Sequence, residues 1–466
     1  MALIIAGDRS GVGKTTVTLS LLACLRQLFP HQQVQSFKVG PDYIDPMFHA
    51  AITGRACRNL DPVLTSEGYV QRCFTTHSKA AHYALIEGVM GLFDGAGATD
   101  TASTAHIAKL LGVPVLLVLD AQRTSRSLAA VAHGFRSFDP EVEIAGVVLN
   151  RVGSDRHQDL LTEALRAISM PVLGVLRRNE AIAIPSRHLG LVPSGELTIQ
   201  PLIDQLVALG KSAFNWDRLT PLLACSDPLP ADRLPLTNQP ENLPPQQNLR
   251  LAIASDNAFN FYYADNLDLL SRQADIVYWS PLRDNLPDDI HGLYLGGGFP
   301  ELFAAELAAN GKALVALRQR AEQGLPIYAE CGGLMYLCQT LTDLEGQRHA
   351  MAGLIPAAVS MGSPLTLGYR RATAIATTPM VSQGAVLWGH EFHHSRLCWL
   401  PDHPPEPTNL PEIYALQRFD GHGLPPEGYQ TSHIHASYVH LHWGATPHLP
   451  QQFLQWCDRY ADQSQC

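Results

Sequence analysis

The 466-residue chain lacks the long apolar runs that mark membrane and exported proteins. No stretch approaches the roughly 20 apolar residues of a membrane helix. The nearest candidate, Val113–Leu119, is strand-sized and contains Pro114. The five apolar residues Ala2–Ala6 are too few for the core of a signal peptide and are typical of a buried strand. We therefore expect a protein with no membrane partner.

Positive charge and paired cysteines are also scarce. Lys and Arg number 33 against 43 Asp and Glu, which gives a formal net charge of −10. Binding to nucleic acid or to an anionic membrane surface normally needs clustered basic side chains, which argues against such partners. The nine cysteines are scattered without CxxC spacing. This pattern argues against a disulfide framework and favours a reducing compartment, so we predict a cytoplasmic protein.

Two series of short apolar runs alternate with helical patterns. This alternation is typical of a parallel sheet with crossover helices, so we predict an α/β fold with two doubly wound domains. The predicted domains span 1–218 and 248–466, joined by a proline-rich linker at 219–247. Residues 356–450 are less regular and are expected to hold antiparallel strands and loops. The expected strands are Leu3–Ala6, Tyr83–Glu87, Val113–Leu119, Ile144–Asn150, Val172–Val175, Leu249–Ser255, Ile276–Trp279, Gly292–Leu295 and Pro326–Ala329.

A glycine-rich turn connects the first expected strand to an amphipathic helix at Thr15–Phe29. The turn reads GDRSGVGKTT at residues 7–16. In such a loop the backbone N–H groups and the helix N-terminus bind phosphates, the lysine contacts the β/γ oxygens, and the next hydroxyl ligates Mg²⁺. We therefore predict a P-loop NTPase domain whose ATP-binding residues are Gly11, Val12, Gly13, Lys14, Thr15 and Thr16.

Two details refine the nucleotide site. Five residues separate Gly7 from Gly13, one more than in the common pattern. The longer loop resembles dethiobiotin synthetase and its relatives, and the resemblance implies transfer of the γ-phosphoryl group to a substrate carboxylate. Asn150 ends another expected strand, where it would either hydrogen-bond a purine edge or serve as an ordinary turn residue.

Carboxylates gather in glycine-rich segments next to the expected strands. Asp42 and Asp45 lie in KVGPDYIDP at residues 38–46, and Glu87 and Asp94 lie in EGVMGLFDG at residues 87–95. The carboxyl ends of parallel strands face the ligand crevice, and Mg²⁺ binds one or two carboxylates together with phosphates. We predict that Thr15, Asp45 and Glu87 lie near Mg²⁺. Asp42 and Asp94 would orient substrate or nucleophile, although exchanges within this set stay open.

A second constellation lies in the C-terminal half. The segment PIYAECGGLMYL, residues 326–337, places Cys331 between an apolar strand and an apolar helix. A nucleophile on such a tight turn needs small neighbours, and the helix N-terminus lowers the thiol pKa. The earlier segment LGGGFP, residues 295–300, offers N–H groups for an oxyanion. We predict a nucleophilic Cys331, in preference to an inert buried cysteine, with an oxyanion hole at Gly297, Gly298 and Gly332.

This second pattern resembles the class I glutamine amidotransferases. In that family a cysteine forms a glutamyl thioester, a downstream histidine activates it, and ammonia is released. The family base usually lies in a His-x-Glu near the C-terminus, whereas here His440 is followed by His442. The resemblance therefore implies a Cys–His dyad without the acidic third member, with His440 the base and His442 the alternative. A zinc site is a competing interpretation of His433, His435, His440 and His442.

Both halves, in this order, resemble the cobyrinate a,c-diamide synthase family, which includes hydrogenobyrinate enzymes. The motifs cover nearly the whole chain outside the linker and comprise GDRSGVGKTT, KVGPDYIDP, EGVMGLFDG, DNAFNFYYADNL, LGGGFPE, AECGGLMYL, LGYR, GHEFHHSR and ASYVHLHW. The resemblance implies that ATP phosphorylates corrin carboxylates and that ammonia from glutamine converts them to amides, at side chain c and then a, in cobalamin biosynthesis. Cobyrinic or hydrogenobyrinic acid, glutamine, ATP and Mg²⁺ are the implied substrates and cofactor, and an oligomer is possible.

Other interpretations stay open at this point. Asp256–Leu270 and Gly389–Arg396 are candidate corrinoid contacts, or else their aromatic residues belong to the core. Cobyric acid synthase shares the same two-domain plan, although EGVMGLFDG and GHEFHHSR favour the a,c enzyme. A nucleotide-switched protein of the partitioning or metallochaperone type, with a vestigial glutaminase domain, is a further alternative. The intact Cys331 and His440 argue against it.

Overall fold

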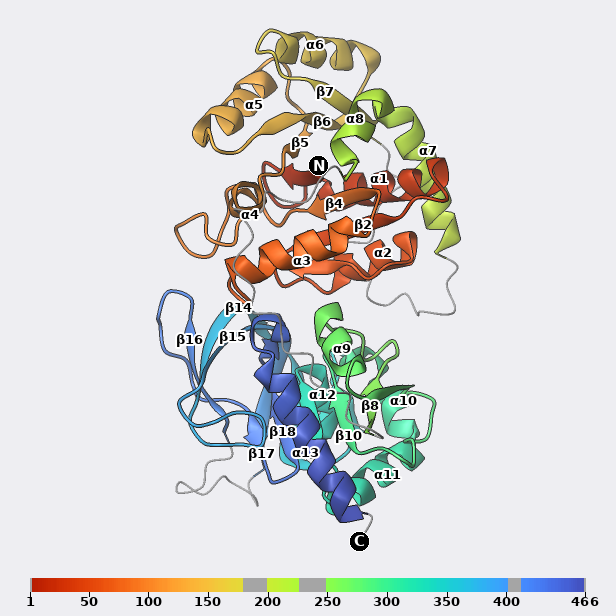
Figure 1. The fold of residues 1–466 in the computed structure, drawn as a ribbon, viewed down its shortest axis with the longest axis vertical. Coiled ribbons are helices and arrows are strands. Elements are labelled where there is room, and N and C mark those ends of the chain that lie inside the picture. The colour runs from red at the N-terminus through yellow and green to blue at the C-terminus, as the bar shows by residue number, and fades with distance from the viewer. Residues whose placement is uncertain (1, 179–198, 226–248, 401–411, 465–466) are drawn as a thin grey trace. The chain divides into compact units, whose positions relative to one another are not determined.

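The computed structural model describes residues 2–178, 199–225, 249–400 and 412–464, which divide between an N-terminal and a C-terminal compact unit (Figure 1). Each unit has its own sheet and hydrophobic core. The α/β architecture in two units was predicted from the alternation of apolar runs with helical patterns.

A seven-stranded parallel sheet forms the centre of the N-terminal unit, in the order β3-β2-β4-β1-β5-β6-β7. Its central strands read as continuous apolar runs because both faces of the sheet are covered. Leu3–Gly7 and Val115–Asp120, for example, are buried at every position. The strands are β1 Leu3–Gly7, β2 Val34–Val39, β3 Arg58–Leu60, β4 Tyr83–Glu87, β5 Val115–Asp120, β6 Ile144–Val152 and β7 Val172–Arg177.

Crossover helices pack against this sheet and begin at well-defined caps. Ser66, Ser103 and Ser154 each accept a hydrogen bond from a backbone N–H in the first turn of the helix that follows. Such caps satisfy N–H groups that have no partner within the helix. The helices are α1 Lys14–Leu28, α2 Ile44–Thr53, α3 Glu67–Lys79, α4 Thr104–Leu111, α5 Ser127–Phe138, α6 Asp155–Arg166, α7 Gln200–Ala213 and α8 Trp216–Leu223.

The C-terminal unit contains a six-stranded sheet in the order β17-β18-β11-β10-β8-β9. All its pairings are parallel except that of β17 with β18. The strands are β8 Arg250–Ala254, β9 Asp275–Trp279, β10 Gly292–Leu295, β11 Ile327–Glu330, β17 Tyr429–Gln430 and β18 Ile434–Ser437. The helices of this unit include α9 Ala264–Ser271, α10 Ala304–Ala309, α11 Gly311–Glu322, α12 Gly332–Leu337 and α13 His448–Ser464.

A second sheet of this unit is built on the long antiparallel pair β14 Ile355–Ala374 and β15 Val386–Trp399. It also includes β12 Cys338–Thr342, β13 Arg348–Ala350, β16 Tyr414–Arg418 and β19 His440–Leu441. The prediction of antiparallel strands within residues 356–450 agrees with this sheet. Because β15 pairs with β19, it places the Gly389–Arg396 segment beside His440.

The predicted strands all exist, with ends that differ by a few residues at most. Four strands were missed. Polar residues break the apolar pattern of β2 and β3, and β12 and β13 lie before the segment in which antiparallel strands were expected. The predicted linker was wrong at its start: Leu219 and Leu223 are fully buried in α8. The remainder of the linker from residue 226 lies outside the described residues. The domain boundary itself stays a prediction.

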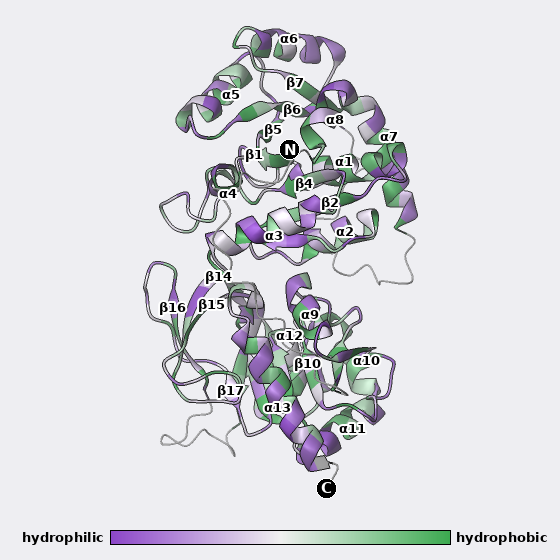
Figure 2. Ribbon diagram, in the orientation of Figure 1, coloured by the Kyte–Doolittle hydropathy of each residue, from purple (hydrophilic) through white to green (hydrophobic). Residues whose placement is uncertain are grey.

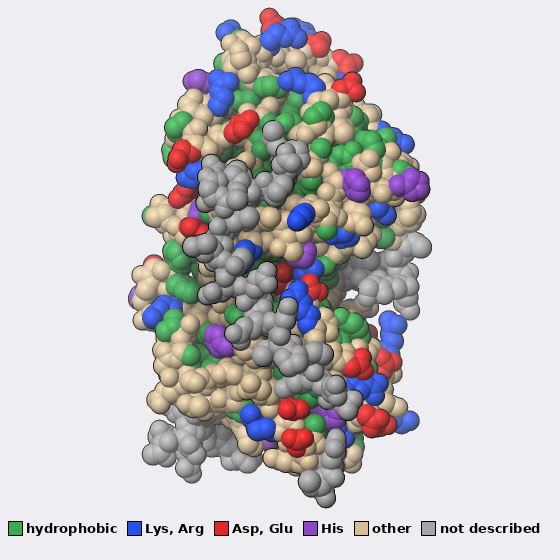
Figure 3. All heavy atoms as spheres, in the orientation of Figure 1, with side chains coloured by type: hydrophobic (Ala, Val, Ile, Leu, Met, Phe, Trp, Pro, Cys, Tyr) green, Lys and Arg blue, Asp and Glu red, His purple; other side chains and the backbone are tan. Residues whose placement is uncertain are grey.

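Colouring by hydropathy shows the sheet strands of both units mostly in green, with purple on the outer helices such as α6 and α13 (Figure 2). On the face drawn as spheres, Lys and Arg are interspersed with Asp and Glu (Figure 3). Within the described ranges, no helix has the length and apolar character needed to cross a bilayer. The eight described cysteines are all free thiols.

Candidate active sites

The glycine-rich turn folds tightly between β1 and α1. Gly11 and Gly13 have φ angles of 76° and 100°, in the left-handed region that favours glycine. A Cβ on Gly7 would lie 2.5 Å from a methyl carbon of Val12. Gly13 is the N-cap of α1, and Thr16 lies in the first turn of this helix. The predicted phosphate-binding residues therefore surround one helix N-terminus. This is the geometry of an anion site.

Lys14 lies across this loop and is 8% exposed. Its ammonium group donates to the carbonyl of Arg9 at 3.1 Å and to that of Met90. Burial and the nearby Lys38 lower the pKa of Lys14 to about 8. The backbone carbonyls therefore hold the ammonium group at the loop where a phosphate would bind.

Asn150 binds the loop from the end of β6. Its side-chain N–H donates to the carbonyl of Val12 at 2.7 Å, and its oxygen accepts from the backbone N–H of Arg151. A Cβ on Gly13 would lie only 2.3 Å from the Asn150 amide nitrogen. The structure thus gives Asn150 a loop-supporting contact, which sequence reasoning had not predicted, and the purine contact stays a prediction.

An arginine pair at the same loop was missed. Arg151 donates to Asp120 at 2.6 Å and to the carbonyl of Gly11 at 3.0 Å, and Arg9 donates to Asp120 at 3.1 Å. The position of Asp120 at the end of β5, next to β1 in the sheet, was the available signal.

Removing the Asn150 amide is expected to weaken ATP binding. Asn150→Ala loses one buried hydrogen bond, which contributes about 1–1.5 kcal/mol. The KM for ATP should therefore rise roughly 5- to 10-fold. Asn150→Asp keeps the shape but sets a carboxylate against the Val12 carbonyl, so its effect should be at least as large. Steady-state kinetics with ATP varied provides the measurement. An unchanged KM in both folded variants would contradict the support role.

The predicted metal-binding residues converge beside the loop. The Thr15 hydroxyl lies 2.6 Å from a Glu87 oxygen and 3.5 Å from an Asp45 oxygen. Asp45 is in the first turn of α2, not in a loop as expected, and Glu87 ends β4. Asp42 accepts hydrogen bonds from the first N–H groups of α2, which holds it at the edge of the same cluster.

Lys38, which sequence reasoning did not single out, lies at the centre of this cluster. Its ammonium nitrogen is 2.6 Å from Asp45, 3.0 Å from Glu87 and 3.7 Å from Asp42. His49 Nε2 donates to the other Glu87 oxygen at 2.8 Å. A lysine side chain is usually solvated even when its strand neighbours, here Phe37 and Val39, are apolar, which is why its sequence context gave no signal.

The charges of the cluster depend on one another. Burial would raise the pKa of Glu87, but Lys38 and His49 together hold it well below its usual range. Burial and the Glu87 charge raise the pKa of Asp45 to about 7. The adjoining carboxylates outweigh burial and keep the pKa of Lys38 well above its usual range. The carboxylates of the cluster are therefore matched by the Lys38 ammonium group and the His49 imidazole.

These residues fit a magnesium ion. Carboxylate and hydroxyl oxygens are the donors that Mg²⁺ prefers, and the Lys38 ammonium already shows a cation held among them. Asp94 is held by a different contact. It accepts from the Gly91 N–H at 2.8 Å within the loop after β4, so its predicted orienting role stays a prediction.

Cys331 occupies a strained turn between β11 and α12. Its φ and ψ are 45° and −100°, a conformation that non-glycine residues rarely adopt. Its N–H donates to the Ser437 carbonyl at 2.7 Å, and a Cβ on Gly333 would lie 2.3 Å from the Leu295 carbonyl oxygen. The predicted nucleophile turn is therefore present, and its glycine is required by close packing.

The predicted lowering of the thiol pKa was wrong. Burial and the Glu301 carboxylate raise the pKa of Cys331, and the hydrogen bond from Gly332 opposes them without prevailing. The thiol lies 3.8 Å from the Phe392 carbonyl oxygen. A protonated thiol in the resting enzyme needs a base to take its proton.

The glycine loop after β10 lies against this turn. A Cβ on Gly332 would be 3.2 Å from the Gly298 backbone nitrogen, and one on Gly298, with φ 154°, would lie 2.1 Å from the Ala258 carbonyl oxygen. The Gly296 N–H donates to the Tyr262 hydroxyl at 2.8 Å, which anchors the loop. The predicted oxyanion residues are therefore brought together.

His440 borders the same loop. A Cβ on Gly297 would lie 2.4 Å from His440 Cε1 and 3.3 Å from its Nε2. On the other side of the ring, Nδ1 is 3.6 Å from a Glu330 oxygen. A carboxylate that sequence reasoning did not single out, from the residue that precedes Cys331, thus lies near the imidazole, and the predicted Cys–His dyad stays a prediction.

His442 faces different partners. Its Nδ1 accepts from the Gly444 N–H at 3.1 Å, its Nε2 is 3.8 Å from Asp265, and its ring centroid is 4.6 Å from that of Tyr263. His435 lies between Thr378 and Tyr414, at 3.3 and 3.2 Å. Among the described residues, these histidines form no group of three that could hold a metal ion, which disfavours the zinc interpretation.

The two candidate corrinoid segments lie largely inside the C-terminal unit. Phe259, Phe261 and Tyr263 are 0%, 3% and 1% exposed, so these aromatic residues belong to the core, as the alternative held. Phe392 places its carbonyl at the Cys331 thiol. Corrinoid contact by either segment stays a prediction.

Two family models match the chain. Residues 3–192 match the CobQ/CobB/MinD/ParA nucleotide binding domain, and residues 250–448 match the CobB/CobQ-like glutamine amidotransferase domain. A protein of Synechococcus sp. strain PCC 6301 named cobyrinate a,c-diamide synthase is 56% identical over 98% of this chain and 99% of its own length. This chain belongs to the cobyrinate a,c-diamide synthase family.

Further members of the family cover the same length. A cobyrinate a,c-diamide synthase of Synechocystis sp. strain PCC 6803 is 50% identical over 98% of this chain and 93% of its own length. A hydrogenobyrinate a,c-diamide synthase of Streptomyces coelicolor is 40% identical over 98% of this chain and 97% of its own length. The resemblance inferred from the motifs is confirmed, as is the fold class of a P-loop domain followed by a glutamine amidotransferase domain.

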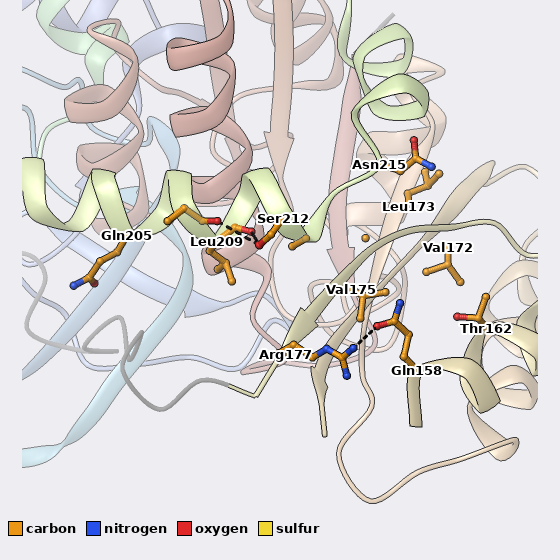
Figure 4. Close-up of a pocket in the computed structure, with 13 residues that line it drawn as sticks. Gln158, Thr162, Val172, Leu173, Val175, Arg177, Gln205, Leu209, Ser212 and Asn215 are labelled. Atoms are coloured by element: carbon orange, nitrogen blue, oxygen red, sulfur yellow. Dashed lines mark hydrogen bonds between the residues drawn. The ribbon is translucent and has the colours of Figure 1, made fainter. Parts of the chain in front are cut away.

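This family member also has a cavity of about 840 Å³ away from the predicted residues (Figure 4). It lies beside the edge strand β7 and is lined from α6 and α7 by side chains that include Gln158, Gln205 and Ser212. Arg177 donates to Gln158 at 2.7 Å across part of its wall. None of the predicted site residues lines it.

Glu427 gives the glutamine amidotransferase unit a pH-dependent stability. Its carboxyl accepts from the Ser437 hydroxyl and from the Tyr438 N–H at 2.9 Å, and burial together with the Glu391 charge raises its pKa to about 8. The folded state therefore retains a proton that the unfolded state loses above its ordinary pKa, so stability falls as pH rises between these two values.

Glu427→Gln is accordingly expected to raise the melting temperature of this unit more at roughly pH 8 than at roughly pH 5. The amide oxygen can accept from the Tyr438 N–H and the amide N–H can donate to the Ser437 hydroxyl oxygen, without a buried charge. Thermal unfolding of wild type and variant at both pH values measures the difference. A melting temperature of Glu427→Gln below that of wild type at roughly pH 8 would contradict the raised pKa of Glu427.

Proposed function

We propose that this chain amidates the a and c carboxylates of cobyrinic or hydrogenobyrinic acid, with ATP as activator and glutamine as nitrogen donor, in cobalamin biosynthesis. The observation that carries the proposal is the presence of two complete sets of reactive groups in one chain: the loop of Lys14 with its acid cluster, and Cys331 with His440. The choice of corrinoid and side chains rests on the names of the relatives.

In the N-terminal unit the substrate carboxylate would attack the γ-phosphorus of ATP, which breaks the bond to ADP and forms an acyl phosphate. Lys14 and the N–H groups at the start of α1 would bind the phosphate oxygens. Thr15, Asp45 and Glu87 would hold Mg²⁺, which when bound neutralises charge on the β/γ-phosphates. Asp42 and Asp94 would orient the substrate or the attacking group.

In the C-terminal unit the thiol of Cys331 would attack the side-chain amide carbon of glutamine. His440 would take the thiol proton and pass it to the departing ammonia, and water would then release glutamate from the thioester. The N–H groups of Gly297, Gly298 and Gly332 would bind the developing oxyanion. Ammonia would attack the acyl phosphate and release inorganic phosphate. Together these steps form a carbon–nitrogen bond at the expense of ATP, which is the reaction of a ligase.

Trapping the acyl phosphate tests the proposal. With hydroxylamine in place of glutamine, the enzyme, ATP and cobyrinic acid should yield ADP and a corrinoid hydroxamate detectable by mass. ADP formed without a hydroxamate, in a preparation that makes amide with ammonia, would contradict carboxylate phosphorylation. Cobyric acid synthase-like amidation of other side chains is the second candidate, and the position of the hydroxamates separates it from the first.

A further inference from the structure

Glu330 is a buried carboxylate next in sequence to the proposed nucleophile. It is the last residue of β11 and is 1% exposed. One of its carboxylate oxygens lies 3.6 Å from Nδ1 of His440, and the His440 side chain is also 1% exposed. We propose that Glu330 is the positioning residue of the glutaminase base, in the role of the acidic third member of a catalytic triad. This inference rests on the proposed function, in which Cys331 and His440 hydrolyse glutamine.

Three donors hold the Glu330 carboxylate in place. The Tyr328 hydroxyl donates to one oxygen at 2.6 Å, and the Leu441 N–H donates to the same oxygen at 3.1 Å. The Tyr294 hydroxyl donates to the second oxygen at 3.1 Å, and this is the oxygen nearest His440. A buried carboxylate must be compensated by such donors. The Leu441 contact also ties the carboxylate to the strand that carries the imidazole.

The orientation of the imidazole ring gives this contact a catalytic meaning. Nδ1 faces Glu330, whereas Cε1 and Nε2 lie on the side of Gly297 in the oxyanion loop. A carboxylate at Nδ1 favours the tautomer with its proton on Nδ1, so that the Nε2 lone pair is presented toward the Gly297 side. In that tautomer Nε2 can accept the proton of a thiol whose burial keeps it protonated.

The separation of 3.6 Å is longer than a formed hydrogen bond. Catalytic hydrogen bonds are often long in the absence of substrate and shorten in the complex. Once His440 gains a proton, the attraction between imidazolium and carboxylate would strengthen the contact, because both groups are shielded from water. The same arrangement explains how this chain manages without the acidic residue that usually follows two positions after the histidine.

Glutamate release by Glu330→Gln tests the inference. The amide keeps the shape of the side chain but can present an N–H to Nδ1, which favours the wrong tautomer. By analogy with the loss of an orienting carboxylate in a serine protease triad, kcat should fall about 10²–10⁴-fold. The KM for glutamine should change by less than about threefold, since the carboxylate does not contact substrate. Amidation with ammonium salts should be unaffected, because it does not use the glutaminase.

The matched control is Glu427→Gln, which makes the same replacement at another carboxyl of this unit, whose hydrogen-bond partners are Ser437 and Tyr438. It should retain glutaminase activity. Cys331→Ala and His440→Ala are assayed in parallel to separate the two levels of the argument. If both retain glutamate release, the proposed function fails; if both lose it while folded Glu330→Gln keeps kcat within about threefold of wild type, only the role of Glu330 fails.

A spectroscopic readout covers the case in which Glu330→Gln does not fold. In ¹⁵N NMR of the wild-type protein, with the His440 signals assigned by their absence from His440→Ala, neutral His440 should carry its proton on Nδ1. In folded Glu330→Gln, but not in Glu427→Gln, the protonation should move toward Nε2. A wild-type His440 protonated on Nε2 would overturn the inference without any variant.

Discussion

Cys331→Ala is expected to remove glutamine-dependent amidation and to leave ammonia-dependent amidation intact. Glutamate release should fall at least about 10³-fold, the usual scale for loss of a covalent nucleophile. Ammonium salts should support amide formation within about twofold of wild type, because phosphorylation uses the N-terminal unit alone. Glutamate and amide product are measured separately, with glutamine and then ammonium chloride as nitrogen source.

Cys338→Ala is the matched control for this variant. Cys338 is a second buried thiol in the same unit, and it donates to the Leu334 carbonyl at 3.3 Å. Its replacement should leave glutamate release nearly unchanged. Equal glutamate release by Cys331→Ala and wild type would refute the nucleophile assignment. Loss of ammonia-driven amidation in folded Cys331→Ala would refute the division of labour.

Lys14→Ala is expected to abolish amidation with either nitrogen source. The ammonium group lies across the phosphate loop, held by carbonyls of Arg9 and Met90, and its removal leaves the developing phosphate charge without its nearest cation. Losses of roughly 10²–10³-fold in kcat are the scale for removing one such electrostatic contact. ADP formation and amide product with cobyrinic acid provide the measurement.

Lys79→Ala is the control for Lys14→Ala, because Lys79 is an exposed residue in the last turn of α3. It should retain full activity. Glutamate release from glutamine alone should persist in Lys14→Ala, since Cys331 and His440 belong to the other unit. Undiminished amidation by folded Lys14→Ala would show that the loop does not bind the reacting phosphates.

Much of this architecture could be predicted because its chemistry depends on local patterns. β1, the loop after it and α1 follow one another within the first 28 residues, so glycine spacing and helical periodicity were enough. The nucleophile turn at Cys331 is equally local. Thr15, Asp45 and Glu87 could be grouped because each belongs to a short glycine-rich segment that the sequence shows directly, and the structure brings them together.

Contacts between distant segments were beyond sequence reasoning. Lys38 reached the acid cluster because β2 pairs with β4, and β2 itself was missed because its polar residues hide the strand pattern. Glu330 was overlooked for a related reason. Two strand registers decide which side chains lie near His440: that of β11 with β18 and that of β15 with β19. A short sequence motif does not predict either register.

The thiol pKa shows where a local rule fails. A helix N-terminus favours a thiolate, which motivated the expectation of a low value for Cys331. Complete burial and the Glu301 charge act in the opposite direction and prevail. The magnitude of desolvation depends on packing around the side chain, so it became visible only in the folded structure. As a result, the mechanism needs a base at the moment of attack.

The most direct measurement combines the enzyme, ATP, cobyrinic acid and glutamine labelled with ¹⁵N in its side-chain amide. The account predicts a product that carries two ¹⁵N-labelled amides, at the a and c side chains, with one ADP formed for each amide. Mass spectrometry with fragmentation, alongside an ADP assay, reads both quantities. A corrinoid recovered without labelled amide, or labelled amide formed without ADP, would contradict the central claim.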